Sequence, residues 1–138
     1  MIHGVAPRVS LVEVLCAAGA YQPSHVYIRY DEQGASPIAT SLQFLVFLSG
    51  ESATLQTSLE TEIWGEVSLS SDVRVLSVLT LSRQLADCGI WSRYAIGGER
   101  PRLIAAAARL PCPTTPGPPA ESANGGAPPG WRPLTLPK

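Results

Sequence analysis

The clearest periodic pattern in the chain lies between residues 71 and 89. Polar residues recur at Arg74, Ser77, Thr80, Gln84 and Asp87, and the remaining residues are mostly Val, Leu and Ala. Spacings of three and four residues place the polar side chains along one stripe of an α-helix. The pattern therefore predicts a largely buried main helix over about residues 72–88, with a glycine, Gly89, suited to end it.

Residues 10–19 carry the signals of a second, shorter helix. Ser10 and Glu13 fit a capping box, in which each side chain bonds to the other residue's backbone N–H. Val9 and Val14 have the spacing of a hydrophobic staple across this start, and Gly19 suits the end. These signals predict a helix over about residues 11–18, which is so short that it needs tertiary contacts to persist.

Short apolar segments between and after these helices are typical of β-strands. The segments expected as strands are residues 25–30, 42–48, 53–59, 63–69 and 90–96. A turn is expected at residues 49–51, and a kink at Gly65. Residues 102–110 fit a helix, because alanine dominates them, or a strand that follows a glycine turn. The hairpin-like context favours the strand.

Together these elements predict an α+β fold in one domain. An antiparallel sheet of about five to six strands would carry the main helix on one face, with the short N-terminal helix beside it. We expect an N-terminal arm over residues 1–9 and the folded domain over residues 10–110. Nine of the 13 prolines lie from Pro111 onward. Residues 111–138 are therefore expected to form a Pro/Gly-rich tail that is disordered, or that docks through Trp131 onto the domain or a partner.

Charge and hydropathy exclude several classes of partner. The net charge of −1 argues against nucleic-acid binding, which needs a basic surface. No apolar run reaches the roughly 18–20 residues of a membrane span. Because the N-terminus shows no secretory signal, the cytoplasm is the expected location. Charged residues make up only 15% of the chain, which indicates a surface partly covered by another chain, or simply a GC-rich genome.

Little in the sequence points to catalysis or cofactor binding. The three cysteines, Cys16, Cys88 and Cys112, are far apart and form no metal motif and no obvious disulfide pattern. Two of them lie in apolar context and are expected to act as small free hydrophobic residues. His25 could serve as a general base, but it has no identifiable acidic partner. We therefore expect that the protein is not an enzyme and binds neither a cofactor nor a metal ion.

Aromatic and arginine residues on the expected strands are candidates for a protein-contact surface, because Trp, Tyr and Arg are the usual anchors of interfaces. The candidates are Tyr27, Arg29, Trp64, Trp91, Arg93, Tyr94 and, in the tail, Trp131. The alternative, which their positions favour, is that Trp91 and Tyr94 pack across a strand pair or beneath the main helix.

One stretch resembles a known group of proteins. It comprises the expected helix ending at Gly89, then Trp91-Ser92-Arg93-Tyr94, a glycine turn, and a strand ending in Ala108-Arg109-Leu110-Pro111. Over about residues 10–110, this order resembles small bacterial α+β domains of the YbjN family and the type III secretion chaperones. The Pro-rich tail stands where those domains have a further helix. The resemblance implies a non-enzymatic dimer or partner-binding module, with a sheet or helix face as its contact surface.

The sequence thus predicts a non-catalytic protein-binding or assembly module of a chaperone-like kind, acting as a homo-oligomer or with a protein partner. The alternative is a structural subunit of a larger particle, such as a phage virion component. Its low charge and an extended tail that orders on neighbouring subunits would suit that role. A third hypothesis, a small hydrolase or toxin, rests only on His25 and nearby polar residues.

Overall fold

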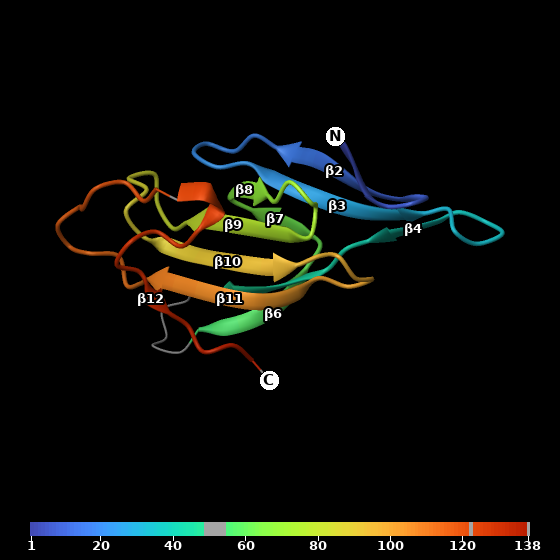
Figure 1. Cartoon of the computed structure of the whole chain (residues 1–138). Coiled ribbons are helices and arrows are strands. Elements are labelled where there is room, and N and C mark those ends of the chain that lie inside the picture. Colours follow the sequence, from blue (N-terminus) through green and yellow to red (C-terminus); the bar gives the residue numbers. More distant parts are fainter. Residues whose placement is uncertain (49–54, 122, 138) are drawn as a thin grey trace.

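The computed structural model describes residues 1–48, 55–121 and 123–137, and these residues are almost entirely β-structure (Figure 1). Strands account for 52% of the described residues and helical turns for 2%, so the predicted α+β class is wrong. The strands are β1 (Ile2–Ala6), β2 (Val9–Ala17), β3 (Ser24–Asp31), β4 (Ile38–Ser41), β5 (Phe44–Leu48), β6 (Gln56–Glu60), β7 (Glu62–Trp64), β8 (Glu66–Leu69), β9 (Val75–Leu81), β10 (Gly89–Ala95), β11 (Arg102–Arg109) and β12 (Arg132–Pro133). A single 3-10 turn, η1 (Ala123–Gly125), precedes β12.

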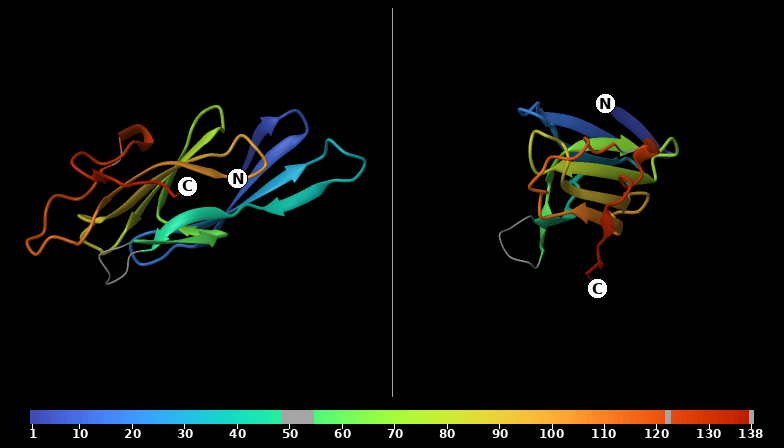
Figure 2. Two further views of the ribbon diagram at one scale, coloured as in Figure 1. Left: turned by 90° about the horizontal axis from the view of Figure 1, so that it is seen from below. Right: turned by 90° about the vertical axis from the view of Figure 1, so that its left-hand side faces the viewer.

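Two antiparallel sheets make up most of the fold. The first, which we call the N-terminal sheet, has the strand order β1-β2-β3-β4, and β7 pairs with the same edge of β3 as β4 does. The second, the C-terminal sheet, has the order β12-β11-β10-β9-β8. Strands β5 and β6 form a separate hairpin, and β5 lies beside β11 (Figures 1 and 2).

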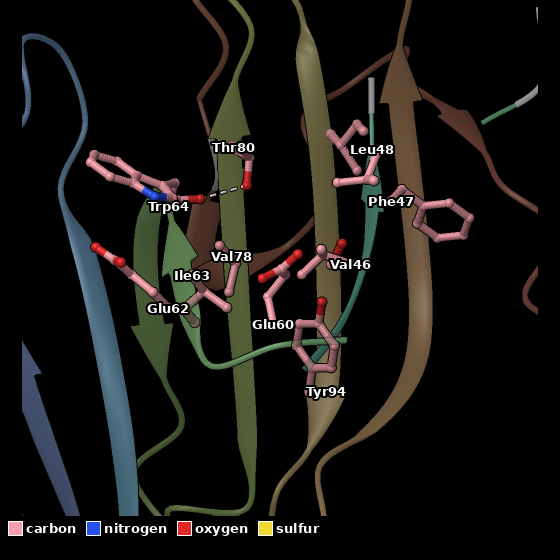
Figure 3. A pocket seen from close by; sticks show the side chains of 12 residues that line it. Val46, Phe47, Leu48, Glu60, Glu62, Ile63, Trp64, Val78, Thr80 and Tyr94 are labelled. Atoms are coloured by element: carbon pink, nitrogen blue, oxygen red, sulfur yellow. Dashed lines mark hydrogen bonds between the residues drawn. The ribbon is translucent and has the colours of Figure 1, made fainter. Parts of the chain in front are cut away.

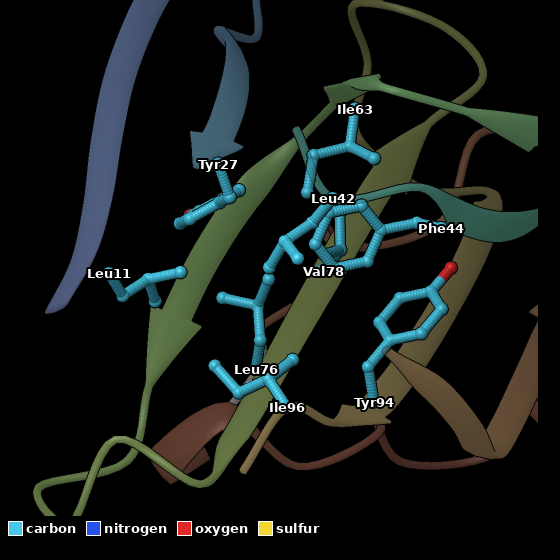
Figure 4. Close-up of a cluster of buried hydrophobic side chains, with 9 residues drawn as sticks. All are labelled: Leu11, Tyr27, Leu42, Phe44, Ile63, Leu76, Val78, Tyr94 and Ile96. Carbon is cyan, nitrogen blue, oxygen red and sulfur yellow. The ribbon is translucent and has the colours of Figure 1, made fainter. Parts of the chain in front are cut away.

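The apolar core lies between these two sheets (Figure 4). Its buried members are Leu11, Tyr27, Leu42, Phe44, Ile63, Leu76, Val78, Tyr94 and Ile96. Phe44, at the start of β5, contacts residues of both sheets. Its ring packs edge-on against those of Tyr27 and Tyr94, with ring centroids 5.8 and 5.1 Å apart. Each tyrosine hydroxyl is satisfied, Tyr27 by donating to Glu13 Oε2 at 2.7 Å and Tyr94 by donating to the Leu45 carbonyl at 2.8 Å.

The main helix predicted over residues 72–88 is replaced by strand β9 and the loop that follows it. Leu76 and Val78 face the core, whereas Leu79 belongs to a second apolar cluster on the opposite face of the sheet. A strand that is covered on both faces shows no alternation of apolar and polar residues. The polar residues that mimicked a helical stripe instead have separate partners. Ser77 accepts a hydrogen bond from Arg93, and Thr80 donates one to the Trp64 carbonyl.

The short helix predicted over residues 11–18 is also wrong, because these residues lie in β2 and at its end. Ser10 lies opposite Tyr30, and Glu13 lies opposite Tyr27, so neither residue caps a helix. Valines at alternate positions of this segment favour a strand, and pairing with both β1 and β3 overrides the local capping signal. The expected N-terminal arm accordingly contains β1, an edge strand of the N-terminal sheet.

Most predicted strands are present. Residues 25–30 lie within β3, residues 90–95 within β10, and residues 102–109 form β11 rather than a helix. The strand expected over residues 42–48 begins at Phe44. The strand expected over residues 53–59 corresponds to β6, which begins at Gln56. Residues 53 and 54 and the turn expected at residues 49–51 lie outside the described residues.

The kink predicted at Gly65 marks the point where the chain crosses from one sheet to the other. Strand β7 pairs in the N-terminal sheet, and β8, which starts one residue later, pairs with β9 in the C-terminal sheet. Gly65 has a φ of +135°, and a Cβ atom there would lie 2.4 Å from the Leu79 carbonyl oxygen. Only glycine fits so close to the neighbouring backbone in this conformation.

The Pro-rich segment returns along the side of the C-terminal sheet that faces away from the N-terminal sheet (Figure 2). Strand β12 pairs with Ala107 and Ala108 of β11, and the backbone N–H of Leu134 donates to the Ala106 carbonyl. Trp131, which is 8% exposed, packs against Leu79, Trp91 and Ala107. Of the two states expected for the tail, docking onto the domain itself is therefore the one that the described residues show.

A disulfide between Cys88 and Cys112 joins the loop after β9 to the start of the tail. The sequence showed no obvious disulfide pattern, and the prediction that Cys88 is a free cysteine is wrong, whereas Cys16 is free and exposed. Beside the disulfide, Arg83 donates two hydrogen bonds to the buried Asp87, at 2.7 and 2.6 Å. Asp87 also accepts from the Gly117 N–H at 3.1 Å, so the carboxylate ties the tail to the loop.

We expect Gly65→Ala to lower the free energy of unfolding by about 2 kcal/mol or more, because it combines an unfavourable φ with a collision against the Leu79 backbone. Urea denaturation monitored by circular dichroism measures this. Gly98→Ala is the matched control, since a Cβ there meets nothing within 4 Å. Equal stabilities of the two variants would contradict the assigned role of Gly65.

The hydrogen bonds from Arg83 hold the pKa of Asp87 well below its usual range. A carboxyl group with a lowered pKa in the folded state stabilises the fold above its unfolded pKa of about 3.9, and that contribution is lost as the pH falls further. Asp87→Asn should therefore unfold at a lower temperature than the wild type at pH 7, and the difference should shrink between pH 5 and pH 2. Differential scanning calorimetry across this range measures both. Glu99→Gln, at an exposed turn, should follow the wild type throughout.

Candidate functional site

The seven residues predicted as protein contacts do not form one surface. Tyr27 and Tyr94 are 0% and 1% exposed and belong to the core between the sheets, as the packing alternative expected for Tyr94. Arg29 pairs with Asp31 at 3.1 Å on β3. Trp64, on β7, is 43% exposed and is the one aromatic candidate with a large free surface.

Three of the candidates come together where the tail packs on the C-terminal sheet. Trp91 and Arg93 belong to the sheet, and Trp131 belongs to the tail. The Arg93 guanidinium lies 5.0 Å from the centre of the Trp91 ring. Trp91 Nε1 and an Arg93 N–H both donate to the Gly125 carbonyl, at 3.0 and 3.3 Å. In this structure Trp91 and Arg93 therefore contact the protein's own C-terminal segment, and a contact with a partner stays a prediction.

A different surface is exposed on the N-terminal sheet. Because Leu11 and Tyr27 face the core, their neighbours along β2 and β3 face outward. The strand register places Val14 opposite Val26, and Val12 opposite both Ile28 and Ile2. We call this surface the outer face. It comprises Ile2, Val12, Val14, Val26, Ile28 and Tyr30.

Nothing among the described residues buries the outer face. None of its six residues belongs to either apolar cluster, and Ile2 and Val14 are 73% and 41% exposed. The charged residues Glu13, Arg29 and Asp31 lie on the other side of their strands, as Tyr27 does. Glu62, which pairs with Val26, is the acidic residue at the margin. The outer face is therefore an apolar sheet surface with little charge.

Sequence reasoning found the alternation in residues 25–30 but did not show which side is buried. The apolar set Val26, Ile28 and Tyr30 faces outward, and the set containing Tyr27 faces the core. Burying Tyr27 is acceptable because Glu13, on the adjacent strand, accepts its hydroxyl proton in a hydrogen bond. Burial and this hydrogen bond also raise the pKa of Tyr27, which keeps the phenol neutral. That pairing depends on strand register, which the sequence does not state.

The described residues show no arrangement typical of a metal centre. No group of three or more His, Cys, Asp or Glu side chains in this part of the chain could hold a metal ion. His25 Nδ1 is buried and has no hydrogen-bond partner among the described residues, so no carboxylate orients that ring nitrogen. Within the same residues, no helix is long and apolar enough to cross a membrane.

The fold and the outer face define a two-sheet antiparallel β protein with one uncovered apolar sheet surface. Comparisons with protein families, with characterised proteins and with solved structures give no match. The α+β architecture implied by the resemblance to the YbjN family and the type III secretion chaperones is not found. Functional inference therefore depends on the physical features of the chain.

Proposed function

We propose that this protein is a non-catalytic assembly module, and that two copies associate through their outer faces. The observation that supports this proposal is the row of six apolar side chains, which includes the 73%-exposed Ile2 and the 41%-exposed Val14. Contiguous apolar patches on soluble proteins are usually interaction sites. Two sheets can pack face to face at a separation of about 10 Å.

A second copy of the chain is the occupant that the charge distribution favours. In a two-fold dimer the same patch meets itself, so any charge near its centre would meet a like charge. Glu13, Arg29 and Asp31 lie on the opposite side of the sheet. The charges at the margin of the outer face are Glu62 and the Met1 ammonium group, which donates to the Glu13 carbonyl at 2.7 Å. The outer face also has no pattern of charges that would select a different partner.

The size of the patch sets the expected affinity. Stable interfaces bury about 800 Å² on each partner, and Val12, Val26, Ile28 and Tyr30 are already half-buried by their neighbours. Only part of the apolar area remains to be gained on association, and ordering the partners opposes binding. We therefore expect a dimer with a dissociation constant in the micromolar range, about 8 kcal/mol of binding free energy.

The two alternatives expected from the sequence receive less support. The hydrolase or toxin hypothesis rested on His25, whose Nδ1 has no partner in the described part of the chain. The larger-particle hypothesis rested partly on a tail that orders on neighbouring subunits. In this structure Trp131 of that tail already occupies the protein's own C-terminal sheet.

The disulfide bears on the compartment in which the protein works. Disulfides persist in oxidising environments and are rare in the reducing cytoplasm. We therefore propose that the protein matures in an oxidising compartment, in place of the cytoplasmic location expected from the sequence. The folded protein should contain one free thiol per chain, because Cys88 and Cys112 are bonded and Cys16 is free.

Protein recovered from its native cell, with thiols blocked by N-ethylmaleimide at lysis, should carry one modified cysteine per chain by mass spectrometry under denaturing conditions. Subsequent reduction should release the other two for a second alkylating agent. Three cysteines modified in the first step would show that the disulfide does not form in the cell. That result would contradict an oxidising compartment and favour the cytoplasm.

Light scattering coupled to size-exclusion chromatography should show the wild-type protein shifting from dimer to monomer on dilution through the micromolar range. Val14→Lys should remain monomeric at every concentration, because association through the outer face would bury an ammonium group of each copy without a counter-charge. The monomer should tolerate this change, since Val14 is 41% exposed and a lysine there can reach water.

Leu85→Lys is the matched control, because Leu85 is 52% exposed in the loop after β9, outside the outer face. This variant should dimerise as the wild type does. A wild type that stays monomeric at millimolar concentration would overturn self-association. Equal loss of dimer in the two lysine variants would show that the contact is not made through the outer face.

A further inference from the structure

A pocket of about 450 Å³ opens at one end of the two-sheet core, between the β5–β6 hairpin, β7 and strands β9 and β10 (Figure 3). Much of its lining is apolar, contributed by Val46, Leu48, Ile63, Val78, Ile90 and Tyr94. A volume of this size lies within the range of small-molecule sites, which typically combine apolar walls with a few polar groups. No feature of the assembly proposal uses this pocket.

The polar group that points into the pocket is the carboxylate of Glu60. In the β5–β6 hairpin Glu60 lies opposite the buried Phe44, which directs its side chain toward the core side. Figure 3 shows the carboxylate between Ile63 and Val46. It accepts one hydrogen bond, from Ser58 Oγ at 2.9 Å.

The other candidate groups of the lining are turned away or already occupied. Glu62 Oε1 accepts a hydrogen bond from the buried Ser24 at 2.6 Å, and its side chain points away from the pocket in Figure 3. The indole of Trp64 also points away, and its carbonyl accepts the Thr80 hydroxyl at 2.7 Å. The Tyr94 hydroxyl is directed to the Leu45 carbonyl. Glu60 is therefore the remaining charged group that a ligand can reach.

Among the residues that the structure describes, no cationic side chain pairs with this carboxylate. The lining includes no Lys, Arg or His, and the ion pairs of the described residues, Arg29–Asp31 and Arg83–Asp87, both lie elsewhere. A carboxylate beside apolar walls should bind most tightly a ligand that carries a positive charge and N–H donors on an apolar stem. An anionic ligand would be repelled, and a neutral one would leave the carboxylate without a charged partner.

We infer that this pocket binds small organic ammonium ions, with the ammonium group on Glu60 and the hydrocarbon part against Ile63, Val78 and Ile90. Recognition has two separable parts. The apolar walls set the preference for a hydrocarbon stem, and Glu60 sets the preference for a cationic head group over a neutral one of the same length.

Isothermal titration calorimetry at pH 7 with hexylammonium chloride, 1-hexanol and sodium hexanoate tests this inference. These probes share one stem and differ in head-group charge. Hexylammonium should bind about tenfold more tightly than hexanol, because the Glu60 carboxylate attracts a charged ammonium group more strongly than a neutral hydroxyl group. Hexanoate should bind most weakly. Equal affinities for hexylammonium and hexanol, or no heat from hexylammonium at millimolar concentration, would overturn the inference.

Glu60→Gln keeps the shape of the side chain and removes its charge. The variant should bind hexylammonium and hexanol equally, with hexanol affinity unchanged. Glu62→Gln is the matched control on the neighbouring strand and should keep the tenfold preference, because Glu62 is engaged with Ser24. Loss of the preference in both variants, or in neither, would show that Glu60 does not select the charge. Both residues are exposed, so circular dichroism should show native folding of both variants. Glu60 lies outside the outer face, so Glu60→Gln should leave the dimer measured by light scattering unaffected.

Discussion

The C-terminal sheet is buried on both faces, and the rest of the structure depends on that constraint. One face packs against the N-terminal sheet through Leu76, Val78 and Tyr94. The tail covers the opposite face through Trp131. A sheet with apolar residues on both sides needs two covering layers. One layer comes from the first half of the chain. The other comes from its last residues, fastened by β12 and by the Cys88–Cys112 disulfide.

Double burial also requires that each polar group inside have a partner. Tyr94 donates to a backbone carbonyl of β5, Arg93 reaches the Gly125 carbonyl in the tail, and Asp87 holds both the loop and the tail. Burial raises the pKa of Tyr94 to about 12, so the phenol stays a neutral donor across the physiological range. An unpaired polar group in these positions would cost more than its hydrogen bond contributes. Tyr94 and Arg93, which resemble interface anchors in the sequence, thus stabilise the fold.

The N-terminal sheet is covered on one face only, and this asymmetry is the basis of the functional proposals. Its outer face presents β-branched side chains with little charge, a surface suited to a second sheet. The pocket beside Glu60 lies at an end of the core instead, where the chain changes sheets near Gly65. The two features use different residues, so assembly and ligand binding can be tested separately.

The sequence by itself determined the strands of residues 25–30 and 90–95, the break at Gly65 and the change of composition at Pro111, because these follow from local alternation and from glycine and proline geometry. For residues 102–109 it only favoured a strand over a helix, because alanine fits both. It did not determine the absence of a main helix or which face of β3 is buried. Residues 75–81 lack alternation because layers distant in sequence cover both sides of them. Likewise, Tyr27 is buried because Glu13 lies across from it. The disulfide, the outer face and the orientation of Glu60 depend on the same long-range pairing, which only the tertiary structure decided.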